Sequence, residues 1–304
     1  MRPKDLALVL AIVLVWGVNF VVIKWGIDDL PPMLLGTLRF VFVAFPAILF
    51  VPKPHLPFRW IALYGLTISF GQFSLLFAAI YVGMPAGLAS VVLQAQALFT
   101  LIFGVFLLRE TISLKQAYAL ITSSVGLIII AAPGDYTHFS ILGFFLTIGA
   151  AASWGIGNIV NKKINEYGSV NMLSLVVWSA LVPILPFAML SIVFDGLDNI
   201  SYSLQNIKFK SICSILYLVC IASLFGYAGW GKLLSRYPAS RISQFALLIP
   251  AVGCWSAWIF LGEALSYTKI IGAIFVMGGL AVSTIPFVSL HTKFLPLFVK
   301  KGRV

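Results

Sequence analysis

The residues of this sequence that are able to bind a ligand inside a membrane are amides, indoles and one guanidinium within long apolar runs. In the first run Trp16, Asn19 and Phe20 recur at the spacing of one helix face. An indole N–H donates a hydrogen bond, and an asparagine amide both donates and accepts one. Polar groups at membrane depth are unfavourable unless they face the bundle interior or a wet cavity. These residue types favour noncovalent binding of a neutral or zwitterionic small molecule.

The same kinds of residue continue through the later apolar runs and together give a candidate substrate cavity. Its predicted members are Trp16, Asn19, Phe20, Arg39, Gln72, Gln94, Gln96, Trp154, Asn158, Asn161, Tyr227 and Trp230. Gln94 and Gln96 point about 200° apart on a regular helix, so only one faces the cavity unless the helix is broken there. Each amide also has a structural interpretation, because asparagine and glutamine often tie membrane helices together.

Arg39 is the one full charge placed clearly at mid-depth. Its guanidinium is able to clamp a substrate carboxylate with two parallel hydrogen bonds. The same group is also able to hold backbone carbonyls in a purely structural role. The residues alone leave both interpretations open.

The remaining chemistry-bearing residues argue against an enzyme or a metal protein. All nine carboxylates fall in loops or at the ends of apolar runs, and the three histidines fall in predicted loops. No HExxH, GxSxG or P-loop sequence occurs, and no nucleophile lies beside a base at depth. Cys213, Cys220 and Cys254 lack CxxC spacing, and we expect them to be buried packing residues. We predict no catalytic residue, cofactor or metal site.

The lack of a carboxylate at mid-depth also bears on the cargo. An exporter of cationic drugs that is coupled to protons is expected to hold a membrane-embedded acid, which carries the proton and pairs with the cation. The sequence therefore favours neutral or zwitterionic cargo. Proton coupling stays open, because Glu110 or Glu263 at a helix end is able to titrate at a vestibule.

Ten apolar runs of membrane-spanning length position these side chains. A helix needs about 20 apolar residues to cross the hydrocarbon, and this chain of 304 residues is 61% apolar and 10% charged. The predicted spans are 5-25, 31-51, 60-81, 85-108, 115-133, 140-161, 171-194, 211-235, 238-262 and 266-288. The first run is too long for a signal-peptide core and has no A-x-A cleavage site, so we expect it to be retained. The fold predicted is an all-α integral membrane protein.

The net charge of +11 is a topology signal. Basic residues alternate between successive loops, and one side of the membrane receives only Lys208, Lys210 and Lys269 outright. The positive-inside rule then predicts that both termini are cytoplasmic. This distribution argues against nucleic acid as a partner.

The chain contains an internal repeat. WGVNFVVIK, residues 16–24, aligns without gaps on WGIGNIVNK, residues 154–162. MPAGLAS...LLRE, which ends at Glu110, aligns at one constant offset on YPASRIS...FLGE, which ends at Glu263. Each half holds five spans, an odd number, so the second half is predicted to be inverted. Inverted repeats are typical of secondary transporters, which bind substrate near the midplane between the halves.

This repeat divides the chain into three parts. Residues 1-133 form the first five-helix repeat, residues 140-288 the second and inverted one, and residues 289-304 a basic cytoplasmic tail. The second half carries an extra segment from about Asp195 to Lys210, which we expect to be a polar outer loop. The candidates for helix-end or gating roles are Lys24, which is able to pair with Asp28, and Glu110, Lys162, Pro250 and Glu263.

Several segments are similar to a known family. VWGVNFVVIK, LRFVFVAFPAI, YGLTISFGQF, GMPAGLASVVLQAQA and GNIVNKK resemble EamA-type members of the drug/metabolite transporter superfamily, and among them the bacterial exporters of O-acetylserine and cysteine. The resemblance covers nearly the whole chain and is weakest at residues 195–210 and after Ser289. It implies ten helices, a central cavity and export across a bacterial inner membrane. It also favours a structural role for Arg39, which is shared by members with varied substrates.

The predicted function is a secondary transporter that exports amino-acid metabolites of the cysteine and O-acetylserine type by alternating access. Its partners are then a small zwitterionic molecule and the lipid bilayer. The alternative is the same fold with other cargo, such as aromatic amino acids, purines or sugar derivatives. An intramembrane enzyme is the rival class that the missing acids and histidines disfavour. Cavity size discriminates between cargoes, because wide aromatic molecules need more room than cysteine.

Overall fold

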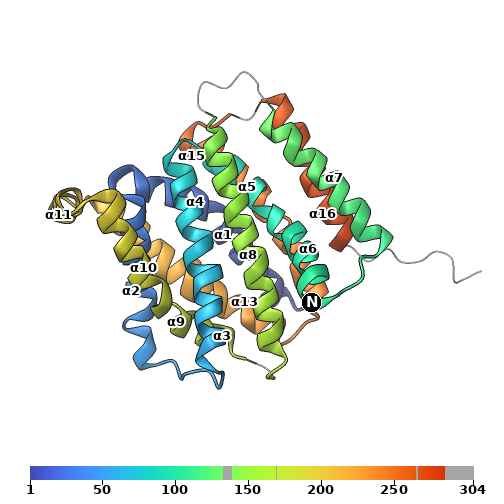
Figure 1. Ribbon diagram of the computed structural model, residues 1–304, viewed down its shortest axis with the longest axis horizontal. Helices are drawn as coiled ribbons and strands as arrows, with labels where there is room; N and C mark the ends of the chain where they lie inside the picture. Colours follow the sequence, from blue (N-terminus) through green and yellow to red (C-terminus); the bar gives the residue numbers. More distant parts are fainter. Residues whose placement is uncertain (133–138, 169, 265, 285–304) are drawn as a thin grey trace, which may run out of the picture.

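The computed structural model describes residues 1–132, 139–168, 170–264 and 266–284, and within these ranges the chain is helical and contains no strand (Figure 1). The α-helices are α1 Pro3–Asp29, α2 Pro32–Ala44, α3 Phe58–Tyr64, α4 Gln72–Tyr81, α5 Ala86–Val92, α6 Gln96–Leu108, α7 Leu114–Ala131, α8 Ile141–Asn165, α9 Met172–Ser179, α10 Leu181–Leu190, α11 Leu197–Gln205, α12 Phe209–Leu216, α13 Gly226–Leu234, α14 Ala239–Ala246, α15 Ile249–Leu261 and α16 Tyr267–Thr284. The linking turns are η1 Ala47–Leu49 and η3 Leu93–Ala95, both 3₁₀, and the π-helical η2 Gly65–Gly71, η4 Ser191–Asp195 and η5 Tyr217–Phe225.

Several of these elements join into longer rods, and nine such segments of the described chain are long and apolar enough to cross a membrane. They are Pro3–Asp29, Pro32–Leu49, Phe58–Tyr81, Ala86–Leu108, Leu114–Ala131, Ile141–Asn165, Met172–Asp195, Phe209–Leu234 and Gln244–Leu261. The segment predicted at 266-288 contains α16, whose apolar part Tyr267–Val282 is shorter. Residues 285–288 and the predicted tail lie outside the described residues. All-helical architecture is thus confirmed for the residues described.

Two expectations from the sequence are wrong. The segment from Asp195 to Lys210 is not simply a loop, because it contains the helix α11, on which Ile200 packs against the main hydrophobic core. An apolar residue with a buried contact draws this otherwise polar stretch into a helix. Cys213 and Cys220 are exposed rather than buried, because they lie on the outward side of the rod that α12 and η5 form.

The rods change helix type at mid-length, and these changes position the polar side chains. A π turn or a 3₁₀ turn alters the rotation of all residues that follow, and both are frequent at functional positions. Gln72 follows η2 directly, and Gln94 lies inside η3. The rod that holds α14 and α15 is likewise interrupted between them, so that α15 begins at Ile249. The side-chain amides of Gln72 and Gln94 therefore lie at irregular points of their helices.

The helix α1 lies inside the bundle and packs against α15, α12, α13 and α5. The main hydrophobic core extends from it to α2, α4 and α5. At one edge of the molecule α7 and α16 lie side by side, and they are the most extensively paired helices of the described chain (Figure 1). The middle of α1 is consequently where side chains from both halves of the sequence meet.

Candidate functional site

A small cavity that is mainly apolar, with several polar side chains on its lining, lies beside the middle of α1. It has a volume of about 90 Å³. It is lined by Trp16, Asn19, Phe20, Arg39, Gln72, Phe73, Leu76, Leu93, Gln94, Trp154, Ala222, Tyr227 and Ile249. These residues come from α1, α2, α4, η3, α8, η5, α13 and α15, so both halves of the chain contribute. Eight of the twelve side chains predicted for the cavity are on this lining.

Arg39 is the charged residue of the cavity. It is 2% exposed, and its Nη2 donates a hydrogen bond to Ser223 Oγ at 3.2 Å. Its guanidinium carbon lies 4.0 Å from the centre of the Phe73 ring and 5.6 Å from that of Phe40, which are cation–π distances. Nε and Nη1 are buried without a hydrogen-bond partner. No carboxylate of the described residues forms an ion pair with this guanidinium.

Two amide oxygens of the cavity are also buried and without a partner. They are Asn19 Oδ1 on α1 and Gln72 Oε1 on α4. Buried polar atoms are almost always hydrogen-bonded in native proteins, and those that are not call for a ligand, water or strain as explanation. Residues of the cavity lining thus carry unused donors on Arg39 and unused acceptors on two neutral amides.

Trp16 forms one wall of the cavity. Its indole N–H donates to the Ala222 carbonyl at 2.9 Å, so this donor is used by the protein. Its ring lies 5.5 Å from that of Tyr227 and 5.1 Å from that of Trp230. Trp230 is not on the lining and packs behind Trp16 instead. The Trp16 ring is therefore held in place by a backbone hydrogen bond and by contacts with the rings of Tyr227 and Trp230.

Three predicted cavity residues besides Trp230 lie elsewhere. Asn158 Nδ2 donates to Gln96 Oε1 at 2.6 Å and to Thr100 Oγ1 at 3.0 Å, so Asn158 and Gln96 tie α8 to α6. Of the two glutamines it is Gln94 that lines the central cavity. Asn161 lines a larger hollow of about 760 Å³ between the end of α8 and α13, beside Lys232.

The tie between α8 and α6 gives a prediction about stability. We expect Asn158→Ala to lower the free energy of unfolding by about 1 kcal/mol, because hydrogen bonds between membrane helices contribute about 0.6 kcal/mol each. Cargo affinity should stay nearly unchanged, whereas Asn19→Ala should weaken binding with little loss of stability. Thermal unfolding and cargo binding of both variants in detergent check this, with Asn161→Ala as control on the same helix. A loss of binding in Asn158→Ala at unchanged stability would contradict the assignment.

The candidate helix-end residues divide between the two ends of the bundle. Glu263 accepts hydrogen bonds from the backbone N–H groups of Ala86 and Gly87, both at 2.9 Å, and so caps the start of α5. Lys24 pairs with Asp28, as their spacing suggests. Pro250 lies in the first turn of α15, where proline fits without disturbing the helix.

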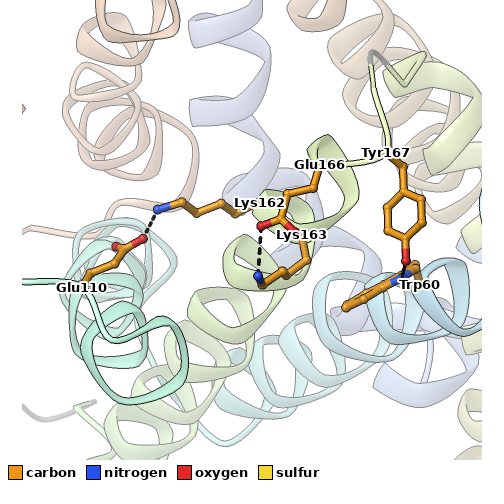
Figure 2. A network of polar contacts seen from close by, with 6 residues as sticks. All are labelled: Trp60, Glu110, Lys162, Lys163, Glu166 and Tyr167. Carbon is orange, nitrogen blue, oxygen red and sulfur yellow. Dashed lines mark hydrogen bonds and ion pairs between the residues drawn. The ribbon is translucent and has the colours of Figure 1, made fainter.

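Figure 2 shows the polar network around Glu110. Lys162 on α8 is directed toward Glu110 and forms an ion pair with it, while Lys163 pairs with Glu166 at 2.9 Å (Figure 2). Nearby, the Tyr167 hydroxyl accepts hydrogen bonds from Arg59 and from Trp60 Nε1, and these bonds lower the pKa of Tyr167. This end of the bundle is therefore held by exposed side-chain pairs.

Sequence reasoning missed Phe73 and Ser223, the two residues that hold Arg39. A phenylalanine in an apolar run carries no signal of its own, and a serine in a membrane helix usually bonds its own backbone. It also missed that the partners of Glu263 are backbone groups, which no sequence pattern reveals. Within the described residues no group of three His, Cys, Asp or Glu side chains is able to hold a metal ion. The amides, rings and guanidinium of the lining suit noncovalent binding of a small polar molecule.

A helical membrane bundle with a small cavity between its two halves, lined by amides, aromatic rings and a guanidinium, is typical of a small-molecule transporter. The sequence matches the model of the EamA-like transporter family over residues 4–132 and 141–285. The chain belongs to this family. It is a transporter rather than an enzyme, and a multi-pass protein of the cell membrane.

Two similar bacterial relatives carry the description of a probable efflux pump. A protein of Salmonella typhimurium described as a "probable amino-acid metabolite efflux pump" is 48% identical over 289 residues, which are 94% of this chain and 97% of the relative. An Escherichia coli protein of the same description is 46% identical over 285 residues, 93% of this chain and 95% of the relative. A solved crystal structure that is 16% identical superimposes with a TM-score of 0.62 over 93% of this chain and 97% of the other, and thus shares the fold.

Proposed function

We propose that this protein exports small zwitterionic amino-acid metabolites, of the cysteine and O-acetylserine type, across the bacterial inner membrane. The description of its relatives as efflux pumps for amino-acid metabolites supports export and the class of cargo. The lining of the central cavity supports the zwitterionic form. No ion of the protein neutralises Arg39 within the described residues, so a cargo carboxylate is the natural counter-ion.

The observation that carries the proposal is the set of unpartnered atoms. An α-amino acid has a carboxylate that accepts hydrogen bonds and an ammonium that donates them. The carboxylate binds the Arg39 guanidinium, which has donors to spare at Nε and Nη1, and the ammonium binds Asn19 Oδ1 and Gln72 Oε1. Gln94 and the ring of Trp154 bound the space that remains. In this arrangement the cargo supplies a counter-ion for Arg39 and hydrogen-bond donors for the two amide oxygens.

The size of the cavity supports a small side chain on the cargo. Drug-sized pockets usually measure about 300–1,000 Å³, whereas this cavity has about 90 Å³. Aromatic amino acids would require the walls formed by Trp16 and Trp154 to move apart. Cysteine and O-acetylserine need less displacement, and this favours them over the aromatic alternative.

The proposed transport cycle is alternating access by two inverted halves, residues 1–133 and 140–288, with both termini in the cytoplasm. The internal sequence repeat supports it. So does an equivalence of local structure: Arg109 and Gly262, at matching positions of the repeat, both end their helices in the left-handed conformation, at φ 55° and 68°. The family match also falls into two parts of similar length. Rocking of one half against the other then exposes the cavity to either side.

Transport by the purified protein tests the proposed function. Proteoliposomes are loaded with labelled cysteine or O-acetylserine, and in parallel with phenylalanine and with a cationic dye. We expect efflux of the first two well above that from protein-free liposomes, and background efflux of the others. Efflux of phenylalanine or the dye alone would keep the family and overturn the cargo. Vesicles with the Arg39→Gln variant are the matched control for leakage through the bundle.

A further inference from the structure

The internal repeat places three pairs of charged residues at matching positions. The alignment of residues 16–24 on 154–162 matches Lys24 with Lys162, and four residues further on it matches Asp28 with Glu166. The second alignment matches Glu110 with Glu263. The two glutamates are also equivalent in local structure, because their own N–H groups donate to Gly104 O at 3.2 Å and to Ala257 O at 3.3 Å.

Matching residues nevertheless have different partners. Glu263 caps α5 through the N–H groups of Ala86 and Gly87, and Lys24 is paired with Asp28. Glu110 is instead paired with Lys162, and its side chain is 43% exposed. Residues that match in the sequence repeat thus make different contacts in the structure. Such asymmetry is what two distinct states of one switch would produce.

Helix packing shows the same asymmetry. At the Glu263 end, α5 packs closely on α15. The matching contact at the other end joins α14 and α6, but the described part of α14 packs mainly on α1, α13 and α16. The hollow of about 760 Å³ beside Asn161 and Lys232 opens at this end. A hollow of about 610 Å³ beside Asp28 and Asp29 lies at the other end, so the asymmetry is one of helix packing: α5 is docked on α15, whereas α14 is not docked on α6.

We propose that Glu263 and Glu110 are alternating latches of the transport cycle. In the state described here Glu263 holds α5 on α15 by capping α5, while Lys162 keeps Glu110 away from α14. In the opposite state Glu110 caps α14 through the N–H groups of Ala239 and Ser240, and Lys162 turns to Glu166. Lys24 then leaves Asp28 for Glu263. This inference rests on the proposed alternating access, not on the identity of the cargo.

The geometry of α1 and α15 fits this exchange. The Trp25 ring lies 5.8 Å from that of Phe260, so the Lys24 end of α1 adjoins the Glu263 end of α15. A helix start has free N–H groups that attract a carboxylate. Each state holds one capped helix start. Of the matched lysines Lys24 and Lys162, each state pairs one across helices and one within its own segment, where Glu166 also pairs with Lys163. The contacts exchanged are alike in kind, so the free-energy difference between the states is small, as a switch requires.

The test measures a distance at the end where Glu110 lies. Spin labels are placed on exposed positions of α6 and α14 by Leu107→Cys and Arg241→Cys, in full-length protein with its three native cysteines changed to serine, in lipid nanodiscs. In the otherwise unchanged protein we expect a longer distance as the main population. Glu263→Gln should raise the ratio of the shorter to the longer distance about tenfold, because the cap loses its charge. Glu110→Gln should lower that ratio.

A second variant removes one contact and leaves every charge in place. Ala86→Pro deletes one N–H that Glu263 binds, and proline is well tolerated at a first helical position. The preceding Pro85 has φ −59° and ψ 134°, a conformation that accepts a following proline. We expect a shift in the same direction as in Glu263→Gln, but smaller. Asp198→Asn on the exposed part of α11 is the control for loss of one carboxylate and should change nothing.

The outcomes separate the latches from the transport function. The latches are overturned if Glu263→Gln and Ala86→Pro both give the distribution of the Asp198→Asn control. They are also overturned if Glu263→Gln and Glu110→Gln shift it in the same direction. The distances are measured without cargo. If they shift as expected and the protein does not export amino acids, the proposed cargo is wrong and the proposal of the latches stands.

Discussion

Replacing Arg39 with glutamine should weaken cargo binding strongly and leave the empty protein at least as stable as before. The guanidinium is 2% exposed and has no carboxylate partner among the described residues. A buried charge without a counter-ion destabilises the folded state. Its removal is therefore expected to raise or maintain the temperature of unfolding, although the contacts with Phe73 and Ser223 are lost.

The loss of binding should be large. Removing one partner of a buried, hydrogen-bonded charge pair costs about 2–5 kcal/mol, and every 1.4 kcal/mol is a tenfold change in Kd, so the Kd for cysteine should rise at least about 30-fold. Arg39→Lys keeps the charge without the planar pair of donors. Its Kd for cysteine should lie between those of the unchanged protein and of Arg39→Gln. Equilibrium binding of labelled cysteine and thermal unfolding without cargo, both in detergent, check these expectations.

The same experiment decides between the two interpretations of Arg39. If the guanidinium served only to tie the helices together, Arg39→Gln would lower the unfolding temperature, and any loss of binding would follow from that. Arg59→Gln is the control. This exposed arginine makes a hydrogen bond to Tyr167 at 3.4 Å, and neither residue lines the cavity. A variant that unfolds more easily and still binds cysteine would remove Arg39 from the site.

Much of the fold follows from the sequence because membrane spans are encoded by length and hydropathy, which are local properties. Polar residues at depth were likewise visible, and Asn19, Arg39, Gln72 and Gln94 all lie around one cavity. Which amides share that cavity could not be read, because it depends on the helix that each one faces. Trp154 and Asn158 are one turn apart on α8, yet the first faces the cavity and the second faces α6.

The periodicity of apolar residues also does not predict where a helix departs from α-helical geometry. The 3₁₀ turn at Leu93–Ala95 answers the question about Gln94 and Gln96, since it breaks the helix there and still brings only Gln94 to the cavity. The cap on α5 was hidden for another reason. Glu263 binds the backbone of residues that lie 177 and 176 positions away in the chain, and a backbone N–H has no residue type that marks it.

Gly126→Ala should destabilise the protein, whereas Gly278→Ala should stabilise it. A Cβ at Gly126 on α7 would lie 2.6 Å from Gly272 O and 2.6 Å from Val276 N, both backbone atoms of α16. A Cβ at Gly278, on α16 itself, would meet nothing within 4 Å. Alanine is preferred over glycine inside a helix by about 1 kcal/mol. Gly278→Ala should therefore raise the free energy of unfolding by about this amount, because the added methyl group meets no neighbour.

The opposite sign at Gly126 follows from packing. The backbones of α7 and α16 approach so closely that an added methyl group must push them apart, and overpacking of this kind costs about 1–3 kcal/mol. Gly279, which matches Gly126 in the repeat, is crowded in the same way by Ala119 O at 2.8 Å. Gly279→Ala should therefore resemble Gly126→Ala. Thermal unfolding of the three variants in one detergent compares them directly.

The packing of α7 on α16 should affect the stability of the protein and not its affinity for cargo. Neither α7 nor α16 contributes to the cavity lining, so the folded fraction of Gly126→Ala should bind cysteine with unchanged Kd. The last helix of each half would then fasten the halves together at one edge while the latches open and close their ends. Equal stability of Gly126→Ala and Gly278→Ala would show that the two helices are loosely paired, and a pivot at this edge would be ruled out.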